Sequence, residues 1–138
     1  MWIFNRRSRA DNLGDALRYL RDDDWEQASR SFLAAMAHIT SLLPPQQAQA
    51  LIGCALCEMA KGRNGAAKNL LVRTRSLSAS GSREAKFADV LDKACDKDFF
   101  ADPLLVPPAS GAGFSFANMV PVEISFLKQS FLELFVAG

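Results

Sequence analysis

The sequence lacks the features that mark several common classes of protein. The chain has three cysteines among 138 residues, whereas a disulfide framework needs a larger, even number. A reducing, cytoplasmic compartment is therefore expected. No apolar run reaches the roughly 18 residues of a membrane span. Aromatic residues precede the arginines at the N-terminus, an order that secretory signals do not use. The net charge of +1 gives no general attraction to nucleic acid or to an anionic membrane.

Catalytic and metal-binding patterns are also scarce. The single histidine, His38, has no cysteine or carboxylate at ligand spacing, and no histidine–carboxylate–nucleophile set can be assembled. The chain has no phosphate-cradling glycine loop and no nucleophile elbow. Cys54 and Cys57 have the spacing of redox and zinc pairs, but they stand mid-way through the most apolar stretch, whereas reactive thiolates favour helix starts. We therefore expect core cysteines in a protein that is not an enzyme and holds no cofactor or metal.

What the sequence does contain is helical periodicity. Apolar residues make up 49% of the chain, enough for the core of one domain. Helices are predicted over 11–21, 25–43 and 83–97, and the stretch 46–77 is predicted to form two helices that turn on 62–65. Pro44 and Pro45 are expected to end the second helix. The third helix is apolar on nearly every side, with Glu58 as its one charge, so it is expected at the centre of the fold.

The composition changes after residue 98. Prolines and glycines are scattered through 99–118, and seven of the ten phenylalanines follow residue 98. A last amphipathic helix is predicted over 121–136, although the alternation of Val122, Ile124 and Phe126 also allows a short strand. The expected organisation is an N-terminal arm (1–8), a helical domain (9–98) and a C-terminal segment (99–138). The last helix is expected to make contacts through Phe126, Phe131, Leu134 and Phe135.

The first two helical hairpins resemble tetratricopeptide repeats. Tyr19, Ala28 and Phe32 fit the pattern in the first unit, and Ala67 and Leu71 fit it in the second. The two alanines are 39 positions apart (67 minus 28), against about 34 in the usual repeat. The resemblance implies an all-α fold of two stacked helical hairpins, with the fifth helix as a cap. The run 55–62 is similar to a helix and turn of the needle chaperones of bacterial type III secretion, which implies a cytoplasmic chaperone that cradles an apolar segment of its client.

Stacked hairpins of this kind present a concave face lined by their first helices. The apolar residues expected on that groove are Leu13, Leu17, Leu20, Ile52, Leu56 and Met59. An apolar groove suits an amphipathic helix, which could come from a partner, from the chain's own tail or from the tail of a second copy.

A second surface is suggested by charge. From residue 61 to residue 83 the chain has six basic residues and no acidic one, which indicates either a solvated face or a docking surface for an acidic partner. Nucleic acid is not expected there, because no aromatic residue interrupts the run to stack a base. The candidate docking residues are Lys61, Arg63, Lys68, Arg73 and Arg75.

These patterns favour a protein–protein interaction module, either an adaptor or a secretion-type chaperone that holds an amphipathic helix. The alternative is a structural subunit that contacts a larger assembly through its Phe-rich tail and basic face. A homo-oligomer formed through the C-terminal tail is also possible.

Overall fold

The computed structural model describes residues 9–96, 120 and 122–135, and this part of the chain is helical. The elements are α1 (Arg9–Arg21), α2 (Trp25–Met36), a 3-10 turn η2 (Ile39–Ser41), α3 (Pro44–Ala60), α4 (Asn64–Leu77), α5 (Arg83–Ala94) and α6 (Val122–Phe135). No strand occurs in the described ranges, so the predicted all-α class is confirmed, and the strand alternative near Val122 is wrong. The predicted arm over 1–8 and the Phe-rich segment over 99–118 lie outside the described residues.

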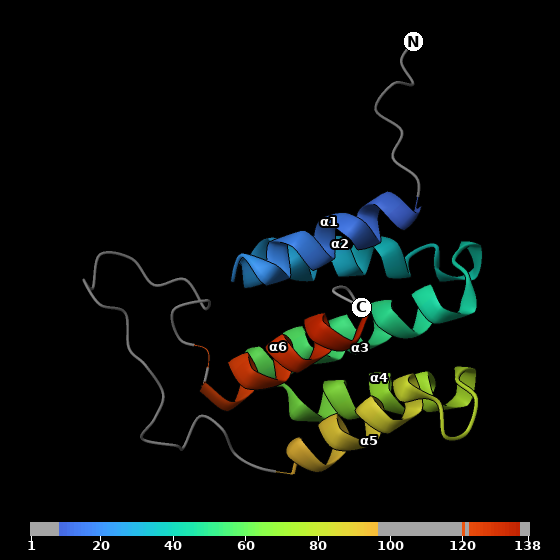
Figure 1. Ribbon diagram of the computed structural model, residues 1–138. Helices are drawn as coiled ribbons and strands as arrows, with labels where there is room; N and C mark the ends of the chain where they lie inside the picture. The colour runs from blue at the N-terminus through green and yellow to red at the C-terminus, as the bar shows by residue number, and fades with distance from the viewer. Residues whose placement is uncertain (1–8, 97–119, 121, 136–138) are drawn as a thin grey trace.

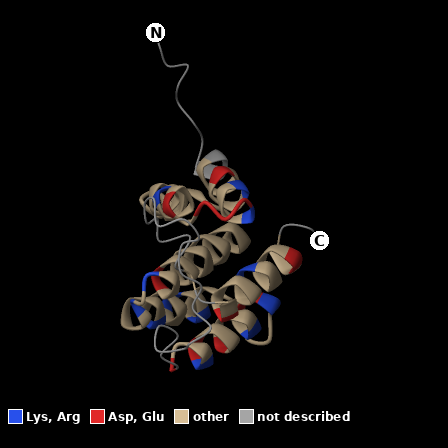
Figure 2. Cartoon of the chain, turned by 90° about the vertical axis from the view of Figure 1, so that its left-hand side faces the viewer, with Lys and Arg blue, Asp and Glu red and all other residues tan. Residues whose placement is uncertain are grey.

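The helices form two layers, and the order within one of them does not follow the chain. One layer holds α2, α3 and α4, which pack against one another in chain order. The other layer holds α1, α6 and α5, with α6 in the middle over α3 (Figures 1 and 2). The helix expected within the separate segment 99–138 thus packs on the same core as the five helices before it.

Helix α3 is the centre of the fold, as its composition predicts. It contacts each of the other five α-helices in the described chain, and an unbroken run from Ala50 to Cys57 is buried. Gly53 lies under the ring of Phe32, and a Cβ at this position would come within 2.2 Å of that ring. Glycine is therefore needed at this point so that α2 can approach α3 closely.

The boundary between α2 and α3 differs from the prediction. Helix α2 ends at Met36, and Pro44 and Pro45 begin α3 instead of closing α2. Proline is tolerated in the first turn of a helix because its missing N–H would have no partner inside that helix. The backbone N–H of Leu43 donates to the side-chain oxygen of Gln46 at 3.1 Å, which fixes the start of α3.

Candidate protein-binding surfaces

The residues predicted to line an apolar groove lie in the hydrophobic core. Leu17 is partly buried and packs against that core, and the other five are buried. None of the six is therefore exposed on an open surface. The five buried residues are Leu13, Leu20, Ile52, Leu56 and Met59.

The face that α1, α3 and α5 present together is covered by α6, and we name this face the α6 groove. Ile124 and Phe131 are both 0% exposed, so α6 inserts them fully into the core. Of the four contacts predicted for this helix, Phe131 is buried and Phe135 is partly buried, whereas Phe126 is 68% and Leu134 40% exposed. The helix thus has one side in the groove and an outer side that still carries large apolar residues.

The first turns of α5 hold the C-terminal end of α6. The ring of Phe87 lies 6.1 Å from that of Phe131 and 5.9 Å from that of Phe135, centroid to centroid. Arg83 donates from its guanidinium to the carbonyl oxygen of Leu134 at 2.8 Å, and its Cζ lies 5.3 Å from the centre of the Phe135 ring. The last carbonyls of a helix have no partner inside that helix, so Arg83 supplies one of them with a donor.

A buried lysine holds the middle of α6 to the turn between α1 and α2. Lys128 is 6% exposed, and its ammonium group pairs with the carboxylate of Asp23 in the turn between α1 and α2. Asp23 has a φ of 62°, a left-handed conformation that Asp and Asn tolerate better than most residues. Lys128 was not among the predicted contacts, although it stands four positions after Ile124 and three before Phe131, on the apolar side of the helix.

Most of the predicted basic docking face is matched by acidic residues of the same chain. Lys68 contacts Asp96 at 2.6 Å, and both Lys68 and Arg75 contact Asp92. These pairs join the solvent-facing side of α4 to α5 and to the turn that follows it.

Two further residues of the predicted docking face pair with Glu58 of α3. The Lys61 ammonium lies 3.7 Å from the Glu58 carboxylate, and the Arg63 guanidinium lies 3.8 Å from it. Arg73 differs, since it has no ion pair within the part of the chain that the structure describes.

Near Arg73 lies a cavity of about 340 Å³ between α2 and α4, with α3 as its floor. We name it the α2–α4 cavity. Its lining contains residues of α2, α3 and α4 and none of α1, α5 or α6, so it opens on the side of the molecule away from α6. The residues around it are Ser29, Leu33, Met36, Cys54, Glu58, Ala66, Asn69, Leu70 and Arg73.

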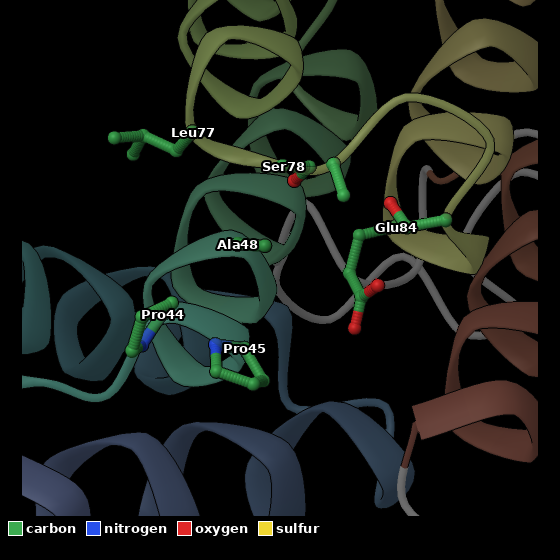
Figure 3. A pocket seen from close by; sticks show the side chains of 8 residues that line it. Pro44, Pro45, Ala48, Leu77, Ser78 and Glu84 are labelled. Carbon is green, nitrogen blue, oxygen red and sulfur yellow. The ribbon is translucent and has the colours of Figure 1, made fainter.

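A smaller cavity of about 150 Å³ lies where α3 begins, between the end of α4 and the start of α5. Figure 3 shows the Glu84 side chain extending into this space and Leu77 pointing away from it. The hydroxyl oxygen of Ser78 is buried and has no hydrogen-bond partner among the described residues, and the hydroxyl of Ser82 accepts from the backbone N–H of Ala85. Among the described residues that line this space, Glu84 supplies a carboxylate and Ser78 and Ser82 supply hydroxyl groups.

The three cysteines are free thiols, and all three are buried. Burial raises the pKa of the Cys54 thiol to about 12 and that of Cys95 to about 11, and burial also raises the pKa of Cys57. At neutral pH all three are therefore protonated thiols, which are poor nucleophiles and poor metal ligands. Within the described ranges no three His, Cys, Asp or Glu side chains meet in a metal-binding group. None of the described helices has the length and apolarity needed to cross a membrane.

No family model, curated protein or solved structure matches the chain. The α6 groove and the α2–α4 cavity are the two candidate binding surfaces of the described chain.

Proposed function

We propose that the protein is a non-enzymatic helix-binding module of the adaptor or chaperone class, and that the α6 groove is its binding surface. The observation that carries the proposal is the seating of α6. An amphipathic helix lies on α1, α3 and α5 with Ile124 and Phe131 fully buried, which is how helix-in-groove recognition works. The resemblance of the first four helices to tetratricopeptide repeats favours the same class of function.

The contacts of α6 define what the groove selects. An apolar residue, a lysine and an aromatic residue stand at positions 124, 128 and 131, on one side of the helix. Asp23 selects the lysine by charge, and Phe87 selects the aromatic ring. A partner helix with the same three groups at the same spacing would fit this surface.

Under this proposal α6 is the resident occupant and a partner helix replaces it. Residues 95–121 connect α5 to α6, so the occupant is held on the same chain. Tethering of this kind gives a segment an effective concentration of the order of millimolar. A partner helix must therefore compete with α6 at this effective concentration, so the affinity of α6 for the groove determines how tightly a partner has to bind.

The test uses the full chain, folded first and then cut at a protease site inserted within residues 104–112. A fluorescent peptide of residues 119–138 is then added, and anisotropy reports its binding. We expect the peptide to exchange with the resident fragment while the helical circular dichroism persists. The Phe131→Ala peptide should bind roughly tenfold more weakly or worse, and the Phe126→Ala peptide should bind as the parent does.

Two results would overturn the proposal. A cut chain that keeps its fragment and never accepts the labelled peptide would make α6 a permanent part of the fold. A cut chain that unfolds would also show that the groove does not exist as a binding surface without its own tail.

A further inference from the structure

The α2–α4 cavity is separate from the α6 groove and has a different chemistry. It lies on the opposite side of α3, and its volume of about 340 Å³ is at the lower end for ligand pockets, which span about 300 to 1,000 Å³. Leu33 stands at its edge with 56% of its surface exposed, and Met36 and Leu70 are partly buried beside it. Leu33, Met36 and Leu70 together line the cavity with apolar side chains, and contiguous apolar surface of this kind marks interaction sites.

The described lining of the cavity holds two charged residues, Glu58 and Arg73. Glu58 is the one carboxylate among the described residues that line it, and that carboxylate is already contacted by Lys61 and Arg63. Arg73 adds a further positive charge with no ion pair inside the described chain. Arg73 is therefore the one cation of the described lining, and no described carboxylate contacts it.

We propose that the α2–α4 cavity docks an acidic amphipathic helix of a partner protein. The partner inserts an apolar side chain beside Leu33 and Leu70 and places a carboxylate on the guanidinium of Arg73. The apolar hollow supplies the burial that helix-in-groove recognition needs, and the unmatched arginine sets the sign of the partner's charge. This surface remains open while α6 occupies its own groove, so the two can be filled together.

The experiment uses the full chain and a synthetic helix-forming peptide with leucines at positions i and i+4 and a glutamate at i+3. Its twin carries lysine in place of glutamate. We expect fluorescence anisotropy at low salt to show binding of the glutamate peptide, with the lysine peptide at least tenfold weaker. Arg73→Gln should weaken binding of the glutamate peptide about tenfold and reduce its salt dependence.

Matched variants separate this surface from general effects on the fold. Leu33→Ser should weaken binding at least tenfold, whereas Val72→Ser should leave it unchanged, because Val72 is also 56% exposed but does not line the cavity. Arg30→Gln, at an exposed arginine of α2 that pairs with Glu26, is the control for lost charge.

Several results would overturn the proposal. These are no binding of the glutamate peptide, equal binding of both peptides, or equal effects of Leu33→Ser and Val72→Ser. Binding of phosphatidylserine vesicles without binding of either peptide would assign the surface to a membrane instead, and would also overturn it.

Discussion

The ammonium group of Lys128 on α6 pairs with the carboxylate of Asp23, which stands 105 positions earlier in the chain. The lysine side chain is 8% exposed and that of the aspartate 65%, so a buried cation has a counter-ion that still touches water. A buried charge without a partner is costly. This pair therefore ties the last helix to the first turn of the fold.

Replacing Asp23 with Asn tests how much the ion pair with Lys128 contributes to stability. Asn tolerates the left-handed backbone at this position, but it removes the negative charge. We expect Asp23→Asn to lower the free energy of unfolding by about 1–2 kcal/mol, less than the 3–5 typical of fully buried pairs, because water reaches the aspartate. Urea denaturation measures the change.

Lys128→Met removes the cation together with its desolvation cost and should destabilise the protein less. An equal or larger loss with Lys128→Met would contradict this reasoning, because methionine keeps an apolar stem and lacks only the charge, so the ammonium group would then contribute more than its desolvation costs.

Gly53 sets how closely α2 approaches α3. A methyl group at this position would lie 2.2 Å from the Phe32 ring, which is itself fully buried and cannot swing into solvent. We expect Gly53→Ala to destabilise the protein by about 1–3 kcal/mol through overpacking.

Gly14 in α1 is the matched control, since a Cβ there would meet nothing within 4 Å. Gly14→Ala should stabilise the protein by about 0.5–1 kcal/mol, because alanine has the higher helix propensity. The combined Gly53→Ala, Phe32→Leu variant should recover part of the loss. Thermal unfolding that is unchanged in Gly53→Ala would contradict the close packing of α2 on α3.

The buried thiols predict how stability depends on alkaline pH. The folded chain holds the Cys54 proton up to a pKa of about 12, whereas the unfolded thiol releases it near 9.0. Between these values the unfolded state binds fewer protons, so the free energy of unfolding falls as the pH rises above 9, and below 9 this contribution is constant. Urea midpoints from pH 8 to 10.5 measure the fall. The double variant Cys54→Ala, Cys57→Ala should show a smaller fall, and an identical slope would mean that these thiols are not buried.

The helices and the centre of the fold could be predicted because they depend on local patterns. The uniform apolarity of residues 50–57 required a helix covered on several sides, and the structure has it there. The end of α2 was predicted wrongly because Pro44 and Pro45 fit both the end of one helix and the first turn of the next. The choice between these depends on the 3-10 turn at Ile39–Ser41, which has no strong local signal.

The surfaces were harder to predict because they depend on which helices meet. The stripe of Leu13, Leu20 and Ile52 has the same sequence pattern whether it faces a groove or a core, and the helices that pack around α1 and α3 bury it. The run of basic residues on α4 looked like a docking face because its acidic partners come from elsewhere in the chain: Asp92 belongs to α5, and Asp96 lies in the turn after α5. Pairing between helices leaves no periodic trace in a single sequence.

The seating of α6 through Phe131 is the central claim, and hydrogen–deuterium exchange followed by mass spectrometry on the intact chain tests it most directly. In the parent protein the amides of α6 should be protected together with those of α3. Phe131→Ala removes a fully buried ring, a truncation that typically costs about 3–5 kcal/mol, so α6 should exchange at least tenfold faster while α3 stays protected. Phe126→Ala should leave the protection of α6 unchanged. Exchange of α6 at the rate of an unstructured peptide in the parent protein, or identical exchange in the two variants, would contradict the account.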